Sequence, residues 1–197
     1  MKRLIMLGVV AASLSGCLDK DDSGNRLIKA VESVVAIEVA NNSPDAAVKS
    51  WWHIKDMSRP MYTEFCKHNQ KVASPYFSKL SQLAASEFID EGECGSTPPL
   101  TFDRQITKVE VQSDTRAVVL ARIKNTTPPD PGAVLDADAK KTKEAGEPFQ
   151  YVLERKDVNS GWKITKVSSM PSYAKDWRDA YPKSEPSNNR FVYGSFQ

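Results

Sequence analysis

The sequence contains two histidines, His53 and His68, and the first of them stands three residues before Asp56. Residues three apart share one face of a helix, so a carboxylate at this spacing could orient the imidazole as a general base. The same spacing is also common on solvated helix faces that carry no chemistry. His53 is therefore a candidate catalytic group, but the pair alone does not indicate an enzyme.

Other patterns that support catalysis or cofactor binding are absent from the sequence. It has no glycine-rich phosphate loop, no cluster of metal ligands and no nucleophile elbow. His68 lies two residues after Cys66, yet no further His or Cys lies near Cys94 to complete a metal site. We expect no metal and no cofactor, and the sequence favours a non-enzymatic protein over an enzyme.

Three large aromatic residues surround His53 in sequence. Trp51, Trp52 and Tyr62 could line a ligand pocket or contact a partner, because aromatic side chains give a large contact area at a small entropic cost. Adjacent helical residues lie about 100° apart, so both tryptophans can be buried only beneath a wide contact. We expect at least one of them in the core, and we treat all four residues as a candidate pocket or interface.

The N-terminus has the layout of an export signal. Lys2 and Arg3 precede an apolar run from Leu4 to Leu14, which is too short for a membrane span of about 20 residues. The next residues complete the stretch Leu14-Ser15-Gly16-Cys17, which resembles the lipobox of bacterial lipoproteins. In that family a signal peptidase cuts before the cysteine, after its thiol has received a diacylglyceryl group. The resemblance implies a signal peptide over residues 1–16 and lipidation of Cys17.

The resemblance also implies a location. A lipobox cysteine of this family carries three acyl chains after N-acylation, and two or more chains give lasting membrane attachment. In the enteric version of the pathway an Asp directly after the cysteine retains the protein in the inner membrane. Here that residue is Leu18, with Asp19 following it. We therefore expect a protein on the periplasmic side of the cell envelope, with the outer membrane favoured over the inner.

Cys66 and Cys94 are the two cysteines that remain once Cys17 is acylated. An oxidising periplasm would favour a disulfide between them. The bond would close a loop of 28 residues, and the chain-entropy argument assigns such a loop roughly 3.5 kcal/mol. A reactive thiol or a metal pair is the alternative with less support.

The charge balance gives no reason to expect nucleic-acid binding. The chain has 27 Lys and Arg against 25 Asp and Glu, and two of the basic residues lie in the signal segment, so the remainder is neutral. A short basic run, Lys140-Lys141-Thr142-Lys143, is flanked by acidic residues and is expected in a solvated loop.

The first part of the chain predicts helices. Residues 17–26 are polar and are expected to form a linker, and Leu27 to Ala40 could be either a short helix or extended. Ser43-Pro44-Asp45 is a helix start, which Pro60 should end or bend so that a second short helix follows over residues 61–69. Ser74-Pro75 begins a third helix, which the apolar spacing extends to Gly92.

The second part of the chain predicts strands. Apolar residues alternate over 107–111 and 117–123 around a turn at 112–114, which indicates a hairpin. A second hairpin is expected from 149–153 and 162–167, with Trp162 and Ile164 on one face and Thr165 and Val167 on the other. Residues 125–146 are rich in Pro and charge and are expected to be a long connection, and residues 171–197 form an aromatic-containing tail.

This order of elements predicts an α+β domain over residues 27–170, in which N-terminal helices pack on a curved antiparallel sheet of about four strands. Together with the opening Ser43-Pro44-Asp45-Ala46-Ala47-Val48 and the closing strand Gly161-Trp162-Lys163-Ile164-Thr165-Lys166-Val167, it resembles the nuclear-transport-factor-2-like cone of bacterial lipoproteins. The resemblance covers residues 43–170. Its 125–146 connection is longer than is usual in that family.

The resemblance implies three functions. The first is a lipid-anchored, non-enzymatic protein that binds a protein partner or a small ligand. The second is an immunity or inhibitor protein that blocks a secreted toxin. The third is a small isomerase or hydrolase that uses a pocket inside the cone, with His53 or a carboxylate in that pocket.

Overall fold

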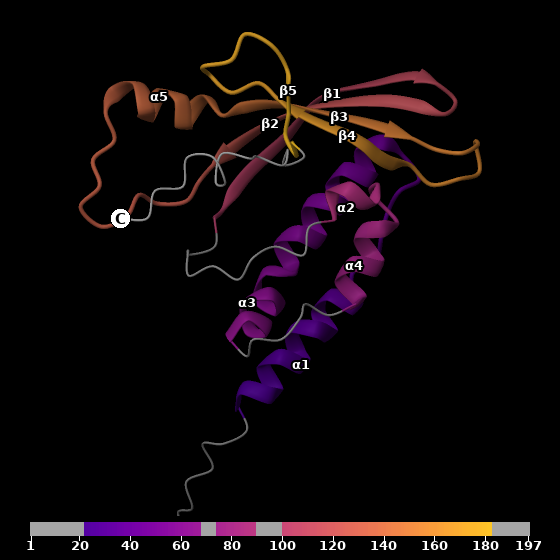
Figure 1. Cartoon of the computed structure of the whole chain (residues 1–197), viewed down its shortest axis with the longest axis horizontal. Coiled ribbons are helices and arrows are strands. Elements are labelled where there is room, and N and C mark those ends of the chain that lie inside the picture. Colours follow the sequence, from indigo (N-terminus) through magenta and orange to yellow (C-terminus); the bar gives the residue numbers. More distant parts are fainter. Residues whose placement is uncertain (1–21, 68–73, 90–99, 183–197) are drawn as a thin grey trace, which may run out of the picture.

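The computed structural model describes residues 22–67, 74–89 and 100–182, which form a helical layer and an antiparallel sheet (Figure 1). The helices are α1 (Asp22–Val35), α2 (Pro44–Met57), α3 (Arg59–Lys67), α4 (Ser74–Ser81) and α5 (Ala137–Ala145), with a 3-10 turn at Ser86–Phe88. The strands are β1 (Phe102–Ser113), β2 (Arg116–Asn125), β3 (Glu147–Glu154), β4 (Lys163–Ser169) and β5 (Arg178–Asp179). The sheet is open, with the order β1-β2-β3-β4-β5, and the predicted α+β class is confirmed.

The start of α2 follows its predicted cap. The side chain of Ser43 accepts a hydrogen bond from the amide of Ala46 at 3.3 Å, and Pro44 occupies the first helical position, where no amide donor is needed. Ser43 also donates to Asp45 at 2.7 Å, and Lys49 lies 2.9 Å from the same carboxylate. These two contacts lower the pKa of Asp45 below its ordinary value.

The break between α2 and α3 falls at Ser58, two residues before Pro60. The sequence predicted that α3 would begin at residue 61, but it begins at Arg59 with Pro60 at its second position. Proline fits there because a first-turn amide has no partner within its own helix. The position of Pro60 thus sets where the helix restarts.

Two helices differ in length from their predictions. α1 begins at Asp22, inside the segment expected to be a linker, and this also decides the open choice for residues 27–35 in favour of helix. α4 ends at Ser81 and does not continue toward Gly92. The chain instead runs beside β4, where the amide of Ile164 donates to Leu83 at 2.7 Å and the amide of Ala85 donates to Ile164 at 3.0 Å.

Both predicted hairpins are present as β1–β2 and β3–β4. The predicted facing of Val167 was wrong. A register shift between Val152 and Leu153 places Tyr151 opposite Val167 and Leu153 opposite Ile164, so Val167 and Ile164 both face the core. A bulge of this kind adds one residue to one strand and reverses the phase of the alternation beyond it.

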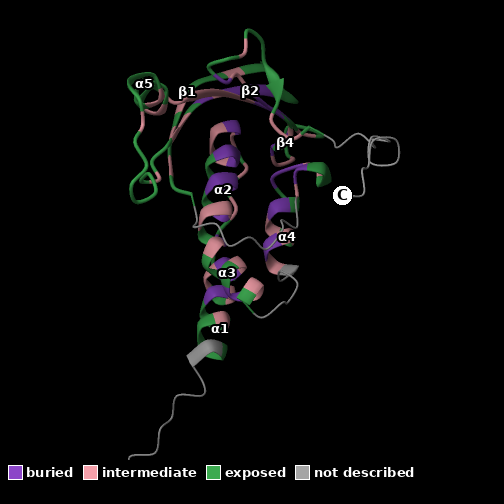
Figure 2. Ribbon diagram, turned by 60° about the vertical axis from the view of Figure 1, so that its left-hand side comes forward, coloured by how far each residue is buried: buried purple, intermediate pink, exposed green. Residues whose placement is uncertain are grey.

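The core lies between the sheet and the helices, and the sheet curves over α2 (Figure 2). Trp51 and Trp52 are both buried there, beneath the wide contact that the sequence argument required. The N-terminal end of α1 is the part of the helical layer farthest from the sheet (Figure 1). None of the described helices combines the length and the apolar character that a membrane crossing requires.

The segment after β2 is more ordered than predicted, and the segment after β4, whose conformation the sequence left open, partly packs on the domain. Residues 137–145 of the predicted long connection, which include the basic run expected in a solvated loop, form α5, and Asp136 caps this helix by accepting from the amide of Ala139 at 2.7 Å. Part of the predicted tail packs on the domain: β5 pairs with the end of β4, and the ring of Tyr181 lies 5.5 Å from that of Phe88. Residues 183–197 lie outside the described part.

Candidate functional site

The His53 and Asp56 pair does not form a catalytic dyad. The Asp56 carboxylate binds the Arg104 guanidinium through both oxygens, at 2.5 and 3.1 Å, and Arg59 lies 3.2 Å from it. Because two guanidiniums already hold this carboxylate, it is not available to orient an imidazole. His53 itself is exposed on α2.

The two tryptophans are core residues with polar or charged partners. The indole of Trp52 donates to the Tyr151 hydroxyl at 2.9 Å, and Lys55 lies 4.6 Å over the Trp51 ring. Burial raises the pKa of Tyr151 well above its usual value near 10, because the phenolate would be desolvated. The hydrogen bond from Trp52 to Tyr151 fixes α2 against β3, whereas the Lys55–Trp51 contact lies within α2.

The remaining predicted site residues are dispersed. Tyr62 and Cys66 are half-buried on α3. Cys17, His68 and Cys94 lie outside the described residues, so the lipidation and the disulfide stay predictions. Within residues 22–67, 74–89 and 100–182, no group of His, Cys, Asp or Glu is arranged to hold a metal ion.

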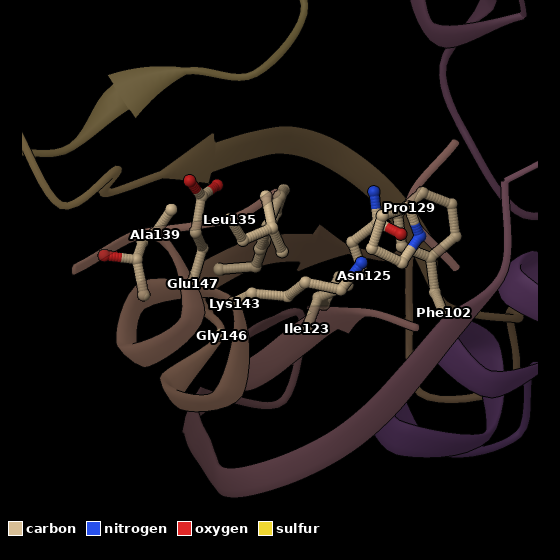
Figure 3. Close-up of a pocket in the computed structure, with 11 residues that line it drawn as sticks. Phe102, Ile123, Asn125, Pro129, Leu135, Ala139, Lys143, Gly146 and Glu147 are labelled. Carbon is tan, nitrogen blue, oxygen red and sulfur yellow. The ribbon is translucent and has the colours of Figure 1, made fainter. Parts of the chain in front are cut away.

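A pocket of about 580 Å³ lies at the end of the sheet where β2 ends and β3 begins (Figure 3). Its wall contains aromatic and aliphatic side chains, with a few polar groups among them. The lining residues are Phe102, Ile123, Asn125, Pro129, Leu135, Ala139, Thr142, Lys143, Gly146, Glu147 and Phe149. Trp51, Trp52, His53 and Tyr62, the described residues that sequence reasoning proposed, do not line it.

The sheet supplies one side of the pocket. Phe102, Ile123 and Phe149 point to the helix-covered face. Ile123 and Phe149 lie in the same phase as core residues of their own strands, and Phe102 lies in the same phase as Ile106, which packs against the core. The helices leave these three side chains half-exposed. Three strands thus provide an apolar surface that the helical layer does not cover.

α5 and the preceding connection supply the opposite side. Ala139 and Lys143 of α5 and Leu135 just before it face the pocket, and none of the α5 residues is buried. The Lys143 ammonium donates to the carbonyl of Thr127, and Arg122 donates to the carbonyls of Ala145 and Gly146 at 3.2 and 3.3 Å. This side of the pocket, formed by α5 and the connection before it, is therefore held in place mainly by polar contacts at its ends.

Gly146 allows the chain to return from α5 to β3. Its φ of +67° is a conformation that L residues rarely adopt, and a Cβ there would lie 2.6 Å from Cγ of Lys124 and 2.8 Å from the carbonyl oxygen of Ile123. Only glycine fits this position without rearrangement. The close approach of Gly146 to β2 holds α5 beside the pocket.

The pocket adjoins the interior contacts of α2. Phe149 stacks on Tyr151 with ring centroids 6.4 Å apart, and Tyr151 in turn contacts Trp52. The guanidiniums of Arg104 and Arg59 lie 5.1 and 5.6 Å from the Phe102 ring. Cation–π contacts and the ion pairs to Asp56 therefore support the pocket wall from behind.

The pocket has the size and chemistry of a small-molecule site. Ligand pockets usually measure about 300–1,000 Å³ and combine apolar walls with a few polar groups. Sequence reasoning predicted the strand that carries Phe149, but it missed the pocket because it treated residues 125–146 as a loop. Two residues in the sequence could have indicated α5: Asp136, which is its N-cap, and Gly146, which follows its last turn.

Comparisons with known proteins identify no relative. The sequence matches no protein family, and neither the curated proteins nor the solved structures contain a match to it.

Proposed function

We propose that this protein is a lipid-anchored, non-enzymatic protein of the cell envelope that binds a small apolar ligand in the pocket between α5 and the sheet. The observation that carries the binding function is the apolar wall formed by Phe102, Ile123 and Phe149, which the helical layer leaves half-exposed. Binding is favourable because an apolar ligand group would leave water as it enters this wall.

The polar groups at the pocket would orient the ligand. Lys143 and Glu147 carry opposite charges, and the side-chain oxygen of Asn125 accepts a hydrogen bond from the amide of Thr127 at 2.9 Å. These groups suit a ligand with an apolar body and a polar end. No described residue arrangement at the pocket supplies a nucleophile with an adjacent base, which supports binding over catalysis.

The anchor is supported by the sequence. Cys17 has the lipobox context, and four residues lie between it and the start of α1 at Asp22. A Cys17→Ala variant should leave the membrane fraction. If this variant remains with membranes as fully as the natural protein does, the proposed anchor is wrong.

Ligand binding in the pocket is tested by filling the pocket with a larger side chain. Ala139 faces the pocket and Ala137 is exposed on the same helix, so Ala139→Phe and Ala137→Phe form a matched pair. An apolar fluorescent dye, anilinonaphthalene sulfonate, should bind the natural protein and the Ala137→Phe variant with equal affinity. Ala139→Phe should weaken binding by about tenfold, because the added ring occupies the apolar volume. Equal dye affinity for all three proteins would exclude the pocket as the site.

A further inference from the structure

The sheet has two edges, and the chain closes one of them. Just before β4 the amide of Trp162 donates to Asn41 at 2.8 Å, and within β4 Ile164 exchanges hydrogen bonds with Leu83 and Ala85. β5 pairs with Ser168 and Ser169 at the other end of the same strand. Little of this edge remains available to another strand.

β1 forms the other edge, and no described segment pairs with its outer side. The strand is 12 residues long, whereas strands in globular proteins usually have about 3–10 residues. The β1–β2 hairpin extends past the helices at its tip (Figure 1). An edge of this length presents unpaired backbone groups that can accept another strand.

The outer half of β1 also exposes apolar side chains. Val109 and Val111 lie opposite Val119 and Ala117, which are fully buried, so all four point to the helix side of the sheet. Val109 is nevertheless 40% exposed and Val111 64% exposed, because the helices do not reach this half of the strand.

The other face of the same segment carries one charge of each sign. Lys108 and Glu110 form an ion pair on the face away from the helices. A lone lysine on an edge strand opposes pairing with another chain. A lysine and a glutamate two residues apart can instead favour pairing with an antiparallel copy of the same segment. In that pairing each charge lies opposite a charge of the other sign.

We propose that β1 pairs antiparallel with β1 of a second copy of this chain, centred on Val109. In this register Lys108 lies opposite the partner's Glu110, and Glu110 lies opposite the partner's Lys108. Val109 lies opposite the partner's Val109. The two sheets join into one, and the arrangement has the twofold symmetry of most protein dimers.

The charges select this register over its neighbours. Moving the symmetry centre by one residue toward the N-terminus places Lys108 opposite itself, and moving it the other way places Glu110 opposite itself. Like charges directly opposite each other destabilise strand pairs. The centre at Val109 is the position that satisfies both charges.

The interface is short. Register shifts lie between Ile106 and Lys108 and between Val111 and Ser113, so regular pairing covers only the residues between them. An interface of this size is below the standard buried area of about 1,600 Å². The dimer should therefore be weak and should form at high protein concentration or on a shared surface.

A cysteine at the symmetry centre tests the contact directly. Val109→Cys in the full-length protein should give an oxidised dimer of twice the monomer mass, because the two Val109 Cα atoms would lie about 4.5–5.5 Å apart. Val134→Cys is the matched control, since Val134 is 91% exposed and far from β1 in sequence. Dimer yields that are equal for the two variants would overturn the proposal. So would a Val109 product joined to a different protein.

Charge exchange tests the register. Lys108→Glu alone turns two attractive pairs into two repulsive ones and should lower the yield of the Val109→Cys dimer by about fivefold or more. Adding Glu110→Lys exchanges the two charges and should restore the yield. If the double exchange stays as low as the single variant, β1 does not pair in this register and the proposal fails.

Discussion

Trp52 and Tyr151 are 99 residues apart in sequence, yet the indole Nε1 of Trp52 donates to the Tyr151 hydroxyl at 2.9 Å inside the core. Their rings meet edge to face at 5.8 Å. This contact joins α2 to β3 directly behind Phe149 of the pocket wall. It is therefore the contact whose loss should affect both stability and ligand binding.

Removing the Tyr151 hydroxyl should destabilise the protein. Tyr151→Phe leaves the Trp52 N–H buried without its acceptor, which costs about 1–3 kcal/mol of unfolding free energy. Trp52→Phe should cost a similar amount or more, because it also removes buried area. In urea unfolding, the double variant should lose about 1 kcal/mol less than the sum of the two single losses. Strict additivity would mean that the hydrogen bond contributes nothing.

Tyr151 should also make the protein sensitive to alkaline pH. Below pH 10 the residue is protonated in both the folded and the unfolded chain, so its contribution to stability is fully present. Above that pH the unfolded chain loses the proton while burial keeps the folded phenol protonated. The unfolding free energy should then fall by up to about 1.4 kcal/mol per pH unit. Urea unfolding between pH 8 and 11 should show this slope reduced in Tyr151→Phe.

Asp56 and His53 should behave differently when substituted. Asp56→Ala leaves the Arg104 guanidinium, whose side chain is only 13% exposed, without its carboxylate. The unfolding free energy should fall by about 1.5–3 kcal/mol. His53→Ala removes an exposed side chain and should change the unfolding free energy by less than about 0.5 kcal/mol. A larger loss in the His53 variant would show a structural role that its exposure does not suggest.

Alanine substitutions at two glycines should distinguish the cost of backbone strain from the cost of a steric clash. Gly146 and Gly132 have φ values of +67° and +86°, but a Cβ at Gly132 would meet nothing within 4 Å. Gly132→Ala should cost about 1 kcal/mol from strain alone. Gly146→Ala should cost about 2 kcal/mol or more, because its Cβ also meets β2. It should weaken dye binding as well, whereas Gly132→Ala should not. Thermal unfolding and dye titration of the two variants make this comparison.

The disulfide prediction has its own measurement. Peptide mapping without reductant should recover Cys66 and Cys94 as one linked pair. A Cys66→Ser variant should lose about 2–4 kcal/mol of unfolding free energy, because the 28-residue loop is no longer closed in the unfolded chain. Recovery of both thiols in free form from protein purified out of an oxidising compartment would contradict the prediction.

The elements that the sequence predicted well are those with an apolar face. The cap at Ser43 and the alternation in β2 and β3 leave a clear pattern, because these residues pack against one core. α5 was missed because it buries no residue and so has no apolar period. The predicted orientation of Val167 was wrong, because the sequence composition does not reveal a bulge. The pocket depends on α5 and so could not be predicted without it.

The position of α1 has a consequence for how two copies could share a membrane. A twofold axis normal to a joined sheet keeps both helical layers on one side of that sheet. α1 lies in this layer, and its N-terminal end is directed away from the strands (Figure 1). The chain from Cys17 to Asp22 reaches at most about 17 Å, so the proposed lipid anchors of two such copies would insert in parallel into one leaflet. Diffusion within that leaflet would bring the β1 edges together at a common height.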